Sequence, residues 1–355
     1  MNQDTDPASL IHWPTDSAIR RAAAALAAGD LVGVPTETVY GLAADATRDD
    51  AVSKIYQAKG RPSTNPLIVH AADATAARRY TSLFVGDRHN AGSDPTLIDQ
   101  WKIASAFWPG PLTVVVPRSS SIPDIVTAGR DTVAIRVPDH PVMRKLLKQC
   151  PFPLAAPSAN VSNYVSPTIA RHVADGLGQS VAMVLDGGRC DWGVESTIIQ
   201  LDADGPRLLR PGGITAEQLR SVFGRIDVPE QGVNHSKAQV APGQLPTHYS
   251  PDKSLVFVDR YETLLGEPSF QAPQRIGRIA FSRLDDAQRS QFDQVWIVDE
   301  TGDLRRIASR LFAVLREADQ SDCDLLVIDR CEEIGIGRAI MDRLRRATRS
   351  VDQSQ

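Results

Sequence analysis

A long segment with four prolines divides this chain of 355 residues into two regions, each with its own pattern of strands and helices. The segment covers residues 224–253 and shows little apolar periodicity. It is too long for an ordinary connection inside a compact domain, so it is either functional or disordered. We therefore predict a first domain over residues 1–223, a linker or lid over residues 224–253, and a second domain over residues 254–355.

Before this segment, short apolar runs alternate with segments of helical pattern. Apolar and β-branched runs predict strands at residues 31–34, 67–69, 112–116, 132–137 and 181–185, and a hairpin formed by residues 194–201 and 207–210. Helix signals predict helices at residues 17–28, 49–58, 98–107, 141–149 and 215–223. This mixture indicates an α/β fold.

The alternation restarts after the linker. Strands are predicted at residues 255–258, 276–281, 295–298 and 325–328. Apolar residues recur at helical spacing over residues 304–318, as in a helix packed on a sheet. Strand–helix–strand repetition predicts a parallel, Rossmann-like sheet. The last predicted helix, residues 337–349, carries five arginines, which indicate a solvated face or, as an alternative, a face that contacts RNA.

The composition excludes several classes of protein. Hydrophobic residues make up 42% of the chain and charged residues 23%, which is typical of globular proteins. A net charge of −4 excludes a basic coat for nucleic acid, although not a local basic pocket. No apolar run approaches the roughly 20 residues of a membrane span, and no signal peptide is visible, so we expect no membrane association. The four cysteines form no C-x-x-C pair, so we expect no metal cluster or disulfide scaffold and a cytoplasmic location.

Several common catalytic motifs are absent from the sequence. It contains no G-x-x-x-x-G-K-[ST], no G-x-G-x-x-G, no G-x-S-x-G and no H-E-x-x-H. These absences argue against a P-loop, a dinucleotide-binding fingerprint, a hydrolase triad and a zinc protease.

A first polar loop, residues 35–42 (PTETVYGL), follows a predicted strand. α/β proteins place ligand-binding loops at such positions. Thr36 and Thr38 offer hydroxyl groups that can donate or accept a hydrogen bond. The alternative is a polar turn in which threonine acts as a local cap.

A second polar loop places Lys59 and Arg61 on either side of a glycine. Arg61 can clamp phosphate oxygens with its planar guanidinium, while Lys59 acts as a point charge. Asn65 can bind the same anion. The alternative is a solvated basic loop. His70, at the end of the next predicted strand, is more often a core residue than a ligand-binding one.

In the predicted strand at residues 132–137, Thr132 and Arg136 share one face. They lie about 13 Å apart, which would suit the two ends of an elongated ligand. An arginine among buried strand residues is rare unless it is paired. An internal pair between Arg136 and a carboxylate is therefore the alternative. Farther along, Ser166 can cap a helix that Pro167 opens, and such a helix start attracts phosphate.

Taken together and in order, seven motifs resemble those of the YrdC-domain family: PTETVYGL, KGRPSTNPL, FWPGPLT, AIRVPDHP, APSAN, VESTI and RPGGI. The end of the linker, with PG and HYSP, is similar to the long two-domain form of that family. The resemblance implies a twisted mixed sheet with helices around a concave cavity, plus a smaller Rossmann-like C-terminal domain. It also implies synthesis of threonylcarbamoyl-AMP from L-threonine, bicarbonate and ATP, with release of pyrophosphate, for the modification of tRNA.

The resemblance further implies roles for individual residues. Lys59 and Arg61 would be the catalytic cations. The threonine-binding residues would be Thr36, His70, Arg136, Ala156 through its backbone, and Ser196. The ATP-binding residues would be Arg61, Asn65, Thr132, Ser158, Asn160, Ser166, Arg210 and Tyr249. Mg²⁺ would be bound to ATP, and no residue of the protein is assigned as a metal ligand. A threonylcarbamoyl transferase would act downstream, and direct contact with tRNA is left open.

Two points depart from the family pattern. Ser162-Asn163 stands where the family usually has Ser-Gly, and because asparagine tolerates the left-handed conformation we expect the turn to survive. Residues 87–95 form a longer loop, which we expect to be a flexible surface loop. A non-catalytic RNA-binding protein is the alternative function.

Overall fold

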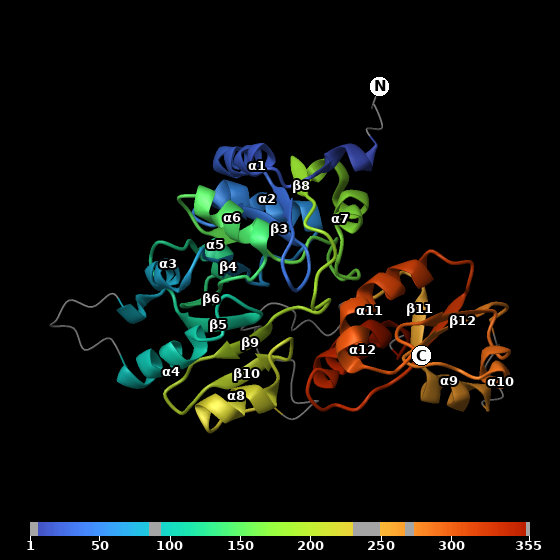
Figure 1. Ribbon diagram of the computed structural model, residues 1–355. Coiled ribbons are helices and arrows are strands. Elements are labelled where there is room, and N and C mark those ends of the chain that lie inside the picture. Colours follow the sequence, from blue (N-terminus) through green and yellow to red (C-terminus); the bar gives the residue numbers. More distant parts are fainter. Residues whose placement is uncertain (1–5, 85–93, 230–248, 267–272, 353–355) are drawn as a thin grey trace.

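The computed structural model describes residues 6–84, 94–229, 249–266 and 273–352, which are organised by two β-sheets (Figure 1). We call the part built on the ten-stranded sheet the N-terminal unit and the part built on the four-stranded sheet the C-terminal unit. The loop predicted at residues 87–95 lies almost wholly outside the described residues, and so does most of the predicted lid.

The sheet of the N-terminal unit mixes parallel and antiparallel pairs, in the order β1-β8-β2-β3-β7-β4-β6-β5-β9-β10. Its strands are β1 (Ile11–His12), β2 (Val32–Val34), β3 (Gly41–Asp45), β4 (Ile68–His70), β5 (Leu112–Pro117), β6 (Thr132–Arg136), β7 (Leu154–Ala155), β8 (Met183–Leu185), β9 (Thr197–Gln200) and β10 (Arg207–Arg210). The predicted hairpin is confirmed, since β9 and β10 pair antiparallel.

Local signals explain where the helices begin and end. The helices of this unit are α1 (Asp16–Ala28), α2 (Asp49–Lys59), α3 (Ala74–Ala77), α4 (Pro95–Ser105), α5 (Asp124–Thr127), α6 (Pro141–Gln149), α7 (Ala170–Leu177) and α8 (Ala216–Phe223), with 3₁₀ turns η1 (Pro7–Leu10), η2 (Arg78–Tyr80), η3 (Ser82–Phe84) and η4 (Gly178–Ser180). Gly29 ends α1 in the left-handed conformation, at φ 88°. Thr215 and Gln218 form the predicted capping box of α8.

Alternate residues of β3 pack against helices on opposite faces of the sheet, as the two-residue period of a strand requires. Ala43 belongs to an apolar cluster with buried residues of α1 and α6, such as Leu26 and Leu146. Leu42 belongs to the larger cluster that contains Ile55 of α2. This sheet is therefore held between helical layers, and its strand ends are left to build a site.

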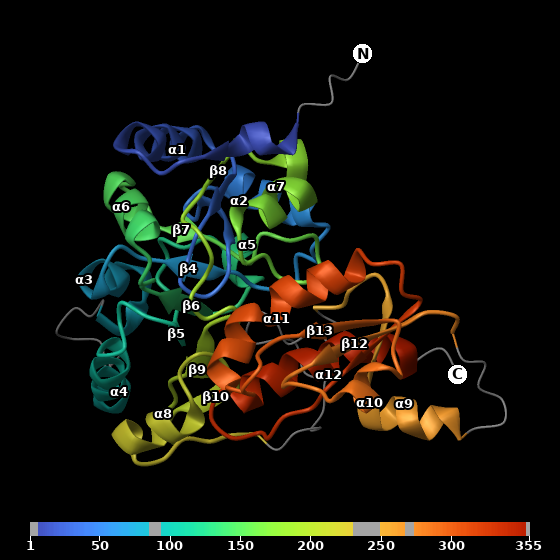
Figure 2. The same cartoon turned by 45° about the vertical axis from the view of Figure 1, so that its right-hand side comes forward.

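The C-terminal unit has the predicted parallel sheet, in the order β11-β14-β12-β13. Its strands are β11 (Ser254–Phe257), β12 (Ile276–Ala280), β13 (Gln294–Ile297) and β14 (Leu325–Ile328), and its helices are α9 (Val258–Leu265), α10 (Asp286–Arg289), α11 (Leu304–Asp319) and α12 (Gly337–Asp352). Helices α11 and α12 lie toward the N-terminal unit, whereas α9 and α10 lie on the far side (Figures 1 and 2). No helix in the described ranges is both long and apolar enough to cross a membrane. All four cysteines are free thiols.

The two units are in close contact. Val39 and Val194 of the N-terminal unit join one buried apolar cluster with Leu311 and Phe312 of α11. At Gly193, which has φ 67°, an added Cβ would lie 2.4 Å from the carbonyl oxygen of Ala308 in α11. A side chain at that position would push the two units apart, so glycine is required there both for its conformation and for the close approach.

The turn at Asn163 has the conformation expected of the family's glycine. Asn163 has φ 70°, and its carbonyl oxygen accepts a hydrogen bond of 2.9 Å from the N–H of Ser250. We expect Asn163→Ala to lower the free energy of unfolding by about 1 kcal/mol, because alanine is strained in the left-handed region, and Asn163→Gly to leave it unchanged or slightly raised. Urea unfolding of the two variants measures the difference, and equal losses in both would contradict this explanation.

Candidate active site

A cavity opens in the N-terminal unit where it meets the C-terminal unit. The sequence-predicted residues that line it are Thr36, Arg61, His70, Arg136, Ala156, Ser158, Ser196, Arg210 and Tyr249. Its other lining residues are Thr38, Val39, Tyr40, Gly41, Ile68, Pro157 and Glu195. Residues far apart in the sequence thus converge on one cavity, as in small-molecule sites.

Directly after β2, the threonine loop forms a tight turn closed by its own side chain. The hydroxyl of Thr36 accepts hydrogen bonds of 3.2 Å from the N–H groups of Thr38 and Val39, and it donates one of 2.6 Å to the carbonyl oxygen of Val39. The polar turn given as an alternative is therefore present, and the same turn places Thr36 in the cavity wall.

Arg136 both lines the cavity and pairs with a buried carboxylate. Its Nη2 lies 2.6 Å from Oε1 of Glu37, and both side chains are almost completely buried. Its Nη1 donates to the hydroxyl of Thr38 (3.0 Å) and its Nε to the carbonyl oxygen of Gly110 (3.3 Å). The internal pair given as the alternative is therefore present. Because a guanidinium has five N–H donors, Arg136 can still bind a ligand carboxylate.

His70 is placed beside Arg136 by the parallel pairing of β4 with β6. Burial, together with the charge of Arg136, lowers the pKa of His70 to about 3, so the imidazole is neutral near pH 7. Its Nδ1 is buried and has no hydrogen-bond partner in the described structure. A neutral ring with an unpaired nitrogen is suited to bind a hydroxyl or amine of a small ligand. The N–H of nearby Ala156 donates to Ile68, so a backbone contact from Ala156 would use its carbonyl oxygen.

Ser196 joins the two predicted halves of the site. Arg210 donates from Nε and Nη2 to the carbonyl oxygen of Ser196, at 3.1 and 2.9 Å, and from Nη2 to its hydroxyl at 3.1 Å. The same hydroxyl lies 2.7 Å from that of Thr113. A residue predicted to bind threonine is thereby fixed by one predicted to bind ATP.

Two buried cations, Lys59 and Arg61, are bound by neutral oxygen atoms alone among the described residues. The Lys59 ammonium donates to the carbonyl oxygens of Ser158 (2.6 Å) and Asn160. Arg61 donates to Asn65 through its carbonyl oxygen (3.2 Å) and Oδ1 (2.6 Å), and to the carbonyl oxygen of the next residue. Burial lowers the pKa of Lys59 well below its ordinary value and that of Arg61 to about 10. Burying a cation without a carboxylate partner costs free energy, and a bound anion would offset that cost. These two side chains are therefore suited to bind an anion.

The remaining predicted residues lie behind or beyond the lining. Nδ2 of Asn65 and Oδ1 of Asn160 are buried without hydrogen-bond partners in the described structure, so each can still bind a ligand group. Thr132 begins β6, four residues before Arg136, and is outside the lining. Lys59 and Ser166 are likewise outside the lining but contact it, through Ser158 and Glu195 respectively. The structure therefore places most of the predicted residues in the cavity wall or in contact with it, and Thr132 at the end of β6 opposite to Arg136.

Tyr249, at the end of the predicted lid, is a buried residue of the cavity wall. It has φ 65° and stacks on Phe312 of α11, with 5.6 Å between the ring centroids. The guanidinium carbon of Arg343 lies 5.4 Å from its ring centre. Tyr249 thus both packs on the C-terminal unit and faces the cavity. The rest of the lid lies outside the described residues.

Comparison with known proteins agrees with this arrangement. A family model described as "Telomere recombination", named for the Sua5, YciO and YrdC proteins, matches residues 24–212. A second model, "Threonylcarbamoyl-AMP synthase, C-terminal domain", matches residues 214–348.

The chain belongs to the Sua5/YrdC family.

Relatives in the Sua5/YrdC family resemble the chain along nearly its whole length. The threonylcarbamoyl-AMP synthase of Bacillus subtilis is 39% identical, covering 94% of this chain and 93% of that protein. The threonylcarbamoyl-AMP synthase of Pyrococcus abyssi is 38% identical, covering 93% of this chain and 94% of that protein. The crystal structure of P. abyssi Sua5 complexed with L-threonine has a TM-score of 0.82 at 36% identity and covers 96% of both chains.

The helix-capping role predicted for Ser166 from its position before Pro167 is wrong. Ser166 does not cap a helix, because α7 begins at Ala170, after an N-cap residue that makes no side-chain bond. Instead the Ser166 hydroxyl donates a hydrogen bond of 2.6 Å to Oε1 of Glu195. A hydrogen bond from a hydroxyl to a carboxylate is charge-assisted and strong, and this bond holds the Ser166 side chain toward Glu195.

The prediction that the arginines of the last helix form a solvated face is wrong for Arg343. This side chain is 1% exposed and forms an ion pair with Glu195, because α12 lies against the N-terminal unit. Arg346 is also largely buried and pairs with Asp342. Sequence reasoning missed Glu195 and Arg343 as neighbours of the site. For Glu195 the signal was its place in the VESTI motif. For Arg343 there was no signal, because the sequence of an arginine-rich helix does not show which of its side chains face the N-terminal unit.

Proposed function

We propose that this chain catalyses the synthesis of threonylcarbamoyl-AMP from L-threonine, bicarbonate and ATP, for the threonylcarbamoyladenosine modification of tRNA. The observation that carries the proposal is a cavity lined by Arg61 and by polar residues around Arg136, with buried Lys59 directly behind the wall at Ser158. Neither Lys59 nor Arg61 has an acidic partner among the described residues. The similarity to threonylcarbamoyl-AMP synthases over both units supports it. A non-catalytic RNA-binding role is not favoured.

The reaction is an adenylyl transfer. The amine of threonine and bicarbonate give an N-carboxylate and water. One oxygen of that carboxylate attacks the α-phosphorus of ATP, the bond to the bridging α–β oxygen breaks, and pyrophosphate leaves. Positioning and charge stabilisation supply most of the catalysis of such steps, so no covalent nucleophile is required. On this basis we assign the enzyme to the nucleotidyltransferases.

In this proposal one group of residues binds threonine and a second group binds ATP. Arg136 would hold the carboxylate of threonine, with His70, Thr36, Ser196 and the backbone of Ala156 around the rest of the amino acid. Phosphate groups would be bound by Arg61, Lys59 and Arg210, with Asn65, Ser158, Asn160, Ser166, Thr132 and Tyr249 along the nucleotide. Both substrates would meet at Ser196, because Arg210 already contacts that residue.

Mg²⁺ would enter with ATP as part of the substrate. The described residues contain no group of three or more His, Cys, Asp or Glu side chains that could hold a metal ion. Phosphate oxygens and water are ordinary Mg²⁺ ligands, and the ion would neutralise part of the triphosphate charge. The protein's own cations would neutralise the rest.

We also propose the division into a catalytic domain at residues 1–223, a linker or lid at residues 224–253 and a further domain at residues 254–355. A cytoplasmic location and a downstream threonylcarbamoyl transferase that accepts the labile product remain predictions, as does direct contact with tRNA.

Release of pyrophosphate in the absence of RNA tests the function. We expect release that depends on threonine, bicarbonate and ATP together, measured with a coupled phosphate assay, and a product of the mass of threonylcarbamoyl-AMP. Tight RNA binding without any such release would instead favour the RNA-binding alternative.

Discrimination against serine is a second expected property. Ile68 and Ala156 give the cavity an apolar wall beside Arg136. Serine lacks the methyl group of threonine, and a missing methyl or methylene in an apolar pocket costs about 1–3 kcal/mol. We therefore expect kcat/KM for serine to be lower by about 10–200-fold, with ATP saturating. Equal values for the two amino acids would contradict the placement of the threonine methyl in this pocket.

A further inference from the structure

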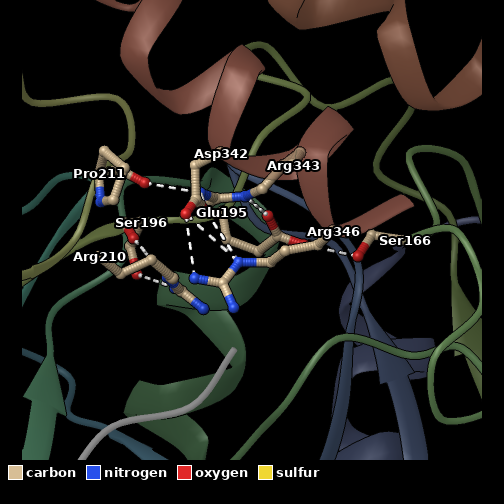
Figure 3. Close-up of polar contacts among 8 residues, drawn as sticks. All are labelled: Ser166, Glu195, Ser196, Arg210, Pro211, Asp342, Arg343 and Arg346. Carbon is tan, nitrogen blue, oxygen red and sulfur yellow. Dashed lines mark hydrogen bonds and ion pairs between the residues drawn. The ribbon is translucent and has the colours of Figure 1, made fainter. Parts of the chain in front are cut away.

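A buried ion pair joins the two units at the cavity, and the reaction as described does not use it (Figure 3). Nε of Arg343, on α12, donates a hydrogen bond of 2.9 Å to Oε2 of Glu195, which lines the cavity. The side chains are 1% and 8% exposed, respectively. A residue of the C-terminal unit therefore sets the charge of a wall of the N-terminal unit.

The carboxylate of Glu195 is held from both sides. Its Oε1 accepts from the hydroxyl of Ser166 and its Oε2 from Arg343, so one partner comes from each unit. In Figure 3 the carboxylate lies between these two partners. Ser166 is one of the residues proposed to bind ATP, and its hydroxyl direction depends on Glu195.

Arg343 also fixes the loop that follows β10. Its Nη1 donates a hydrogen bond of 2.9 Å to the carbonyl oxygen of Pro211. At the next residue, Gly212, an added Cβ would lie 2.4 Å from the carbonyl oxygen of Glu195, so this loop and the backbone of Glu195 are in direct contact. One guanidinium thus holds the Glu195 side chain and the adjoining loop, which begins after Arg210.

The charge of Glu195 determines how this contact would affect ATP. A carboxylate in the wall of a triphosphate site would repel the substrate, and the repulsion is strong where water is excluded. Asp342, beside Arg343, is bound both by Arg343 at 2.8 Å and by Arg346 at 3.0 Å, so it keeps a cationic partner when Arg343 is replaced. Although burial alone would lower the pKa of Arg343, the neighbouring Tyr249, Glu195 and Asp342 hold it above its ordinary value, so the side chain stays charged.

We propose that Arg343 is a positioning residue for ATP: it neutralises and orients Glu195, so that the docking of α12 makes the nucleotide half of the cavity competent. This inference rests on the proposed function, which places ATP in that half. It gives the C-terminal unit a role in the reaction that does not require it to touch the substrate.

Binding measurements on the full chain test the proposal. The variants are Arg343→Met and the double variant Arg343→Met with Glu195→Gln. In the double variant the charge of Glu195 is removed together with its partner, Asp342 keeps its pair with Arg346, and the amide oxygen of residue 195 can still accept from Ser166. Arg278→Met is the matched control, because Arg278 forms a similar, largely buried pair with Asp329 (2.6 Å) within the C-terminal unit. Calorimetry gives the Kd of ATP with threonine saturating, and the Kd of threonine alone; thermal unfolding of each variant reports its Tm.

We expect Arg343→Met to raise the Kd of ATP at least about tenfold and to change the Kd of threonine by less than about threefold, because an unpaired buried charge is costly and lies on the nucleotide side. The double variant should return the Kd of ATP to within about threefold of the original value. The control should lower Tm alone.

An unchanged Kd of ATP in Arg343→Met would overturn the proposal. So would a double variant as weak as the single one, since that result means that Arg343 serves packing rather than charge balance. Failure of the unsubstituted chain to bind ATP would contradict the proposed function itself, and this inference with it. Titrating the unsubstituted chain first therefore separates a failure of the proposed function from a failure of the role of Arg343 alone.

Discussion

Lys59→Ala and Arg61→Ala are each expected to lower the rate of threonine-dependent pyrophosphate release by about 10²–10³-fold, the usual loss when one preorganised donor to a developing negative charge is removed. Both cations are buried and have no acidic partner among the described residues, so their charge is available to the leaving pyrophosphate. Because Lys59 also holds the carbonyl oxygens of Ser158 and Asn160, its loss should affect both charge and loop position.

Lys59→Arg separates these two effects. The guanidinium keeps the charge but cannot replace a compact ammonium that bonds two carbonyl oxygens in a site 1% exposed, so we expect no full rescue. Lys54→Ala is the matched control, because Lys54 lies on the same helix, α2, and its ammonium donates to the carbonyl oxygen of Gly29 away from the cavity. Steady-state rates and Tm are compared in each case. Near-normal release by both Lys59→Ala and Arg61→Ala would refute their assignment.

Local signals in the sequence were sufficient for most of the fold. Capping pairs, helix-ending glycines and β-branched runs are short-range features, and for that reason α6 and β14 begin and end where they were predicted. The motifs also identified many of the residues that line the cavity, because ligand-binding loops follow strand ends whose positions were predictable.

Contacts between residues far apart in the sequence were beyond sequence reasoning. Arg343 was read as part of a solvated face, since the pattern of α12 alone does not reveal that its arginine side meets Glu195. Ser166 was read as a helix cap because Pro167 follows it, while its true partner is far away in the sequence. Both errors have one cause: the strongest acceptor for a polar side chain was supplied by tertiary structure.

The Arg136→Gln variant should weaken threonine binding by about 10–100-fold, since a hydrogen bond to a charged group contributes about 1.5–3 kcal/mol. The affinity for ATP should change by less than about threefold, because the proposed function assigns Arg136 to the amino acid and not to the nucleotide. Calorimetric titration of each substrate measures both values. The pair with Glu37 complicates the single variant, because it leaves a buried carboxylate without its cation, which costs about 3–5 kcal/mol of stability.

Glu37→Gln in the Arg136→Gln background removes that complication. With both charges gone, we expect most of the lost stability to return, as it does when a buried ion pair is replaced as a whole. Threonine affinity should stay low, because the cation that would meet the substrate carboxylate is still missing. Lower Tm in the single variant, recovery of Tm in the double variant and weak threonine binding in both would establish that Arg136 acts on the ligand. If threonine affinity recovers together with Tm, Arg136 serves the fold, and the carboxylate of threonine must be bound elsewhere in the cavity.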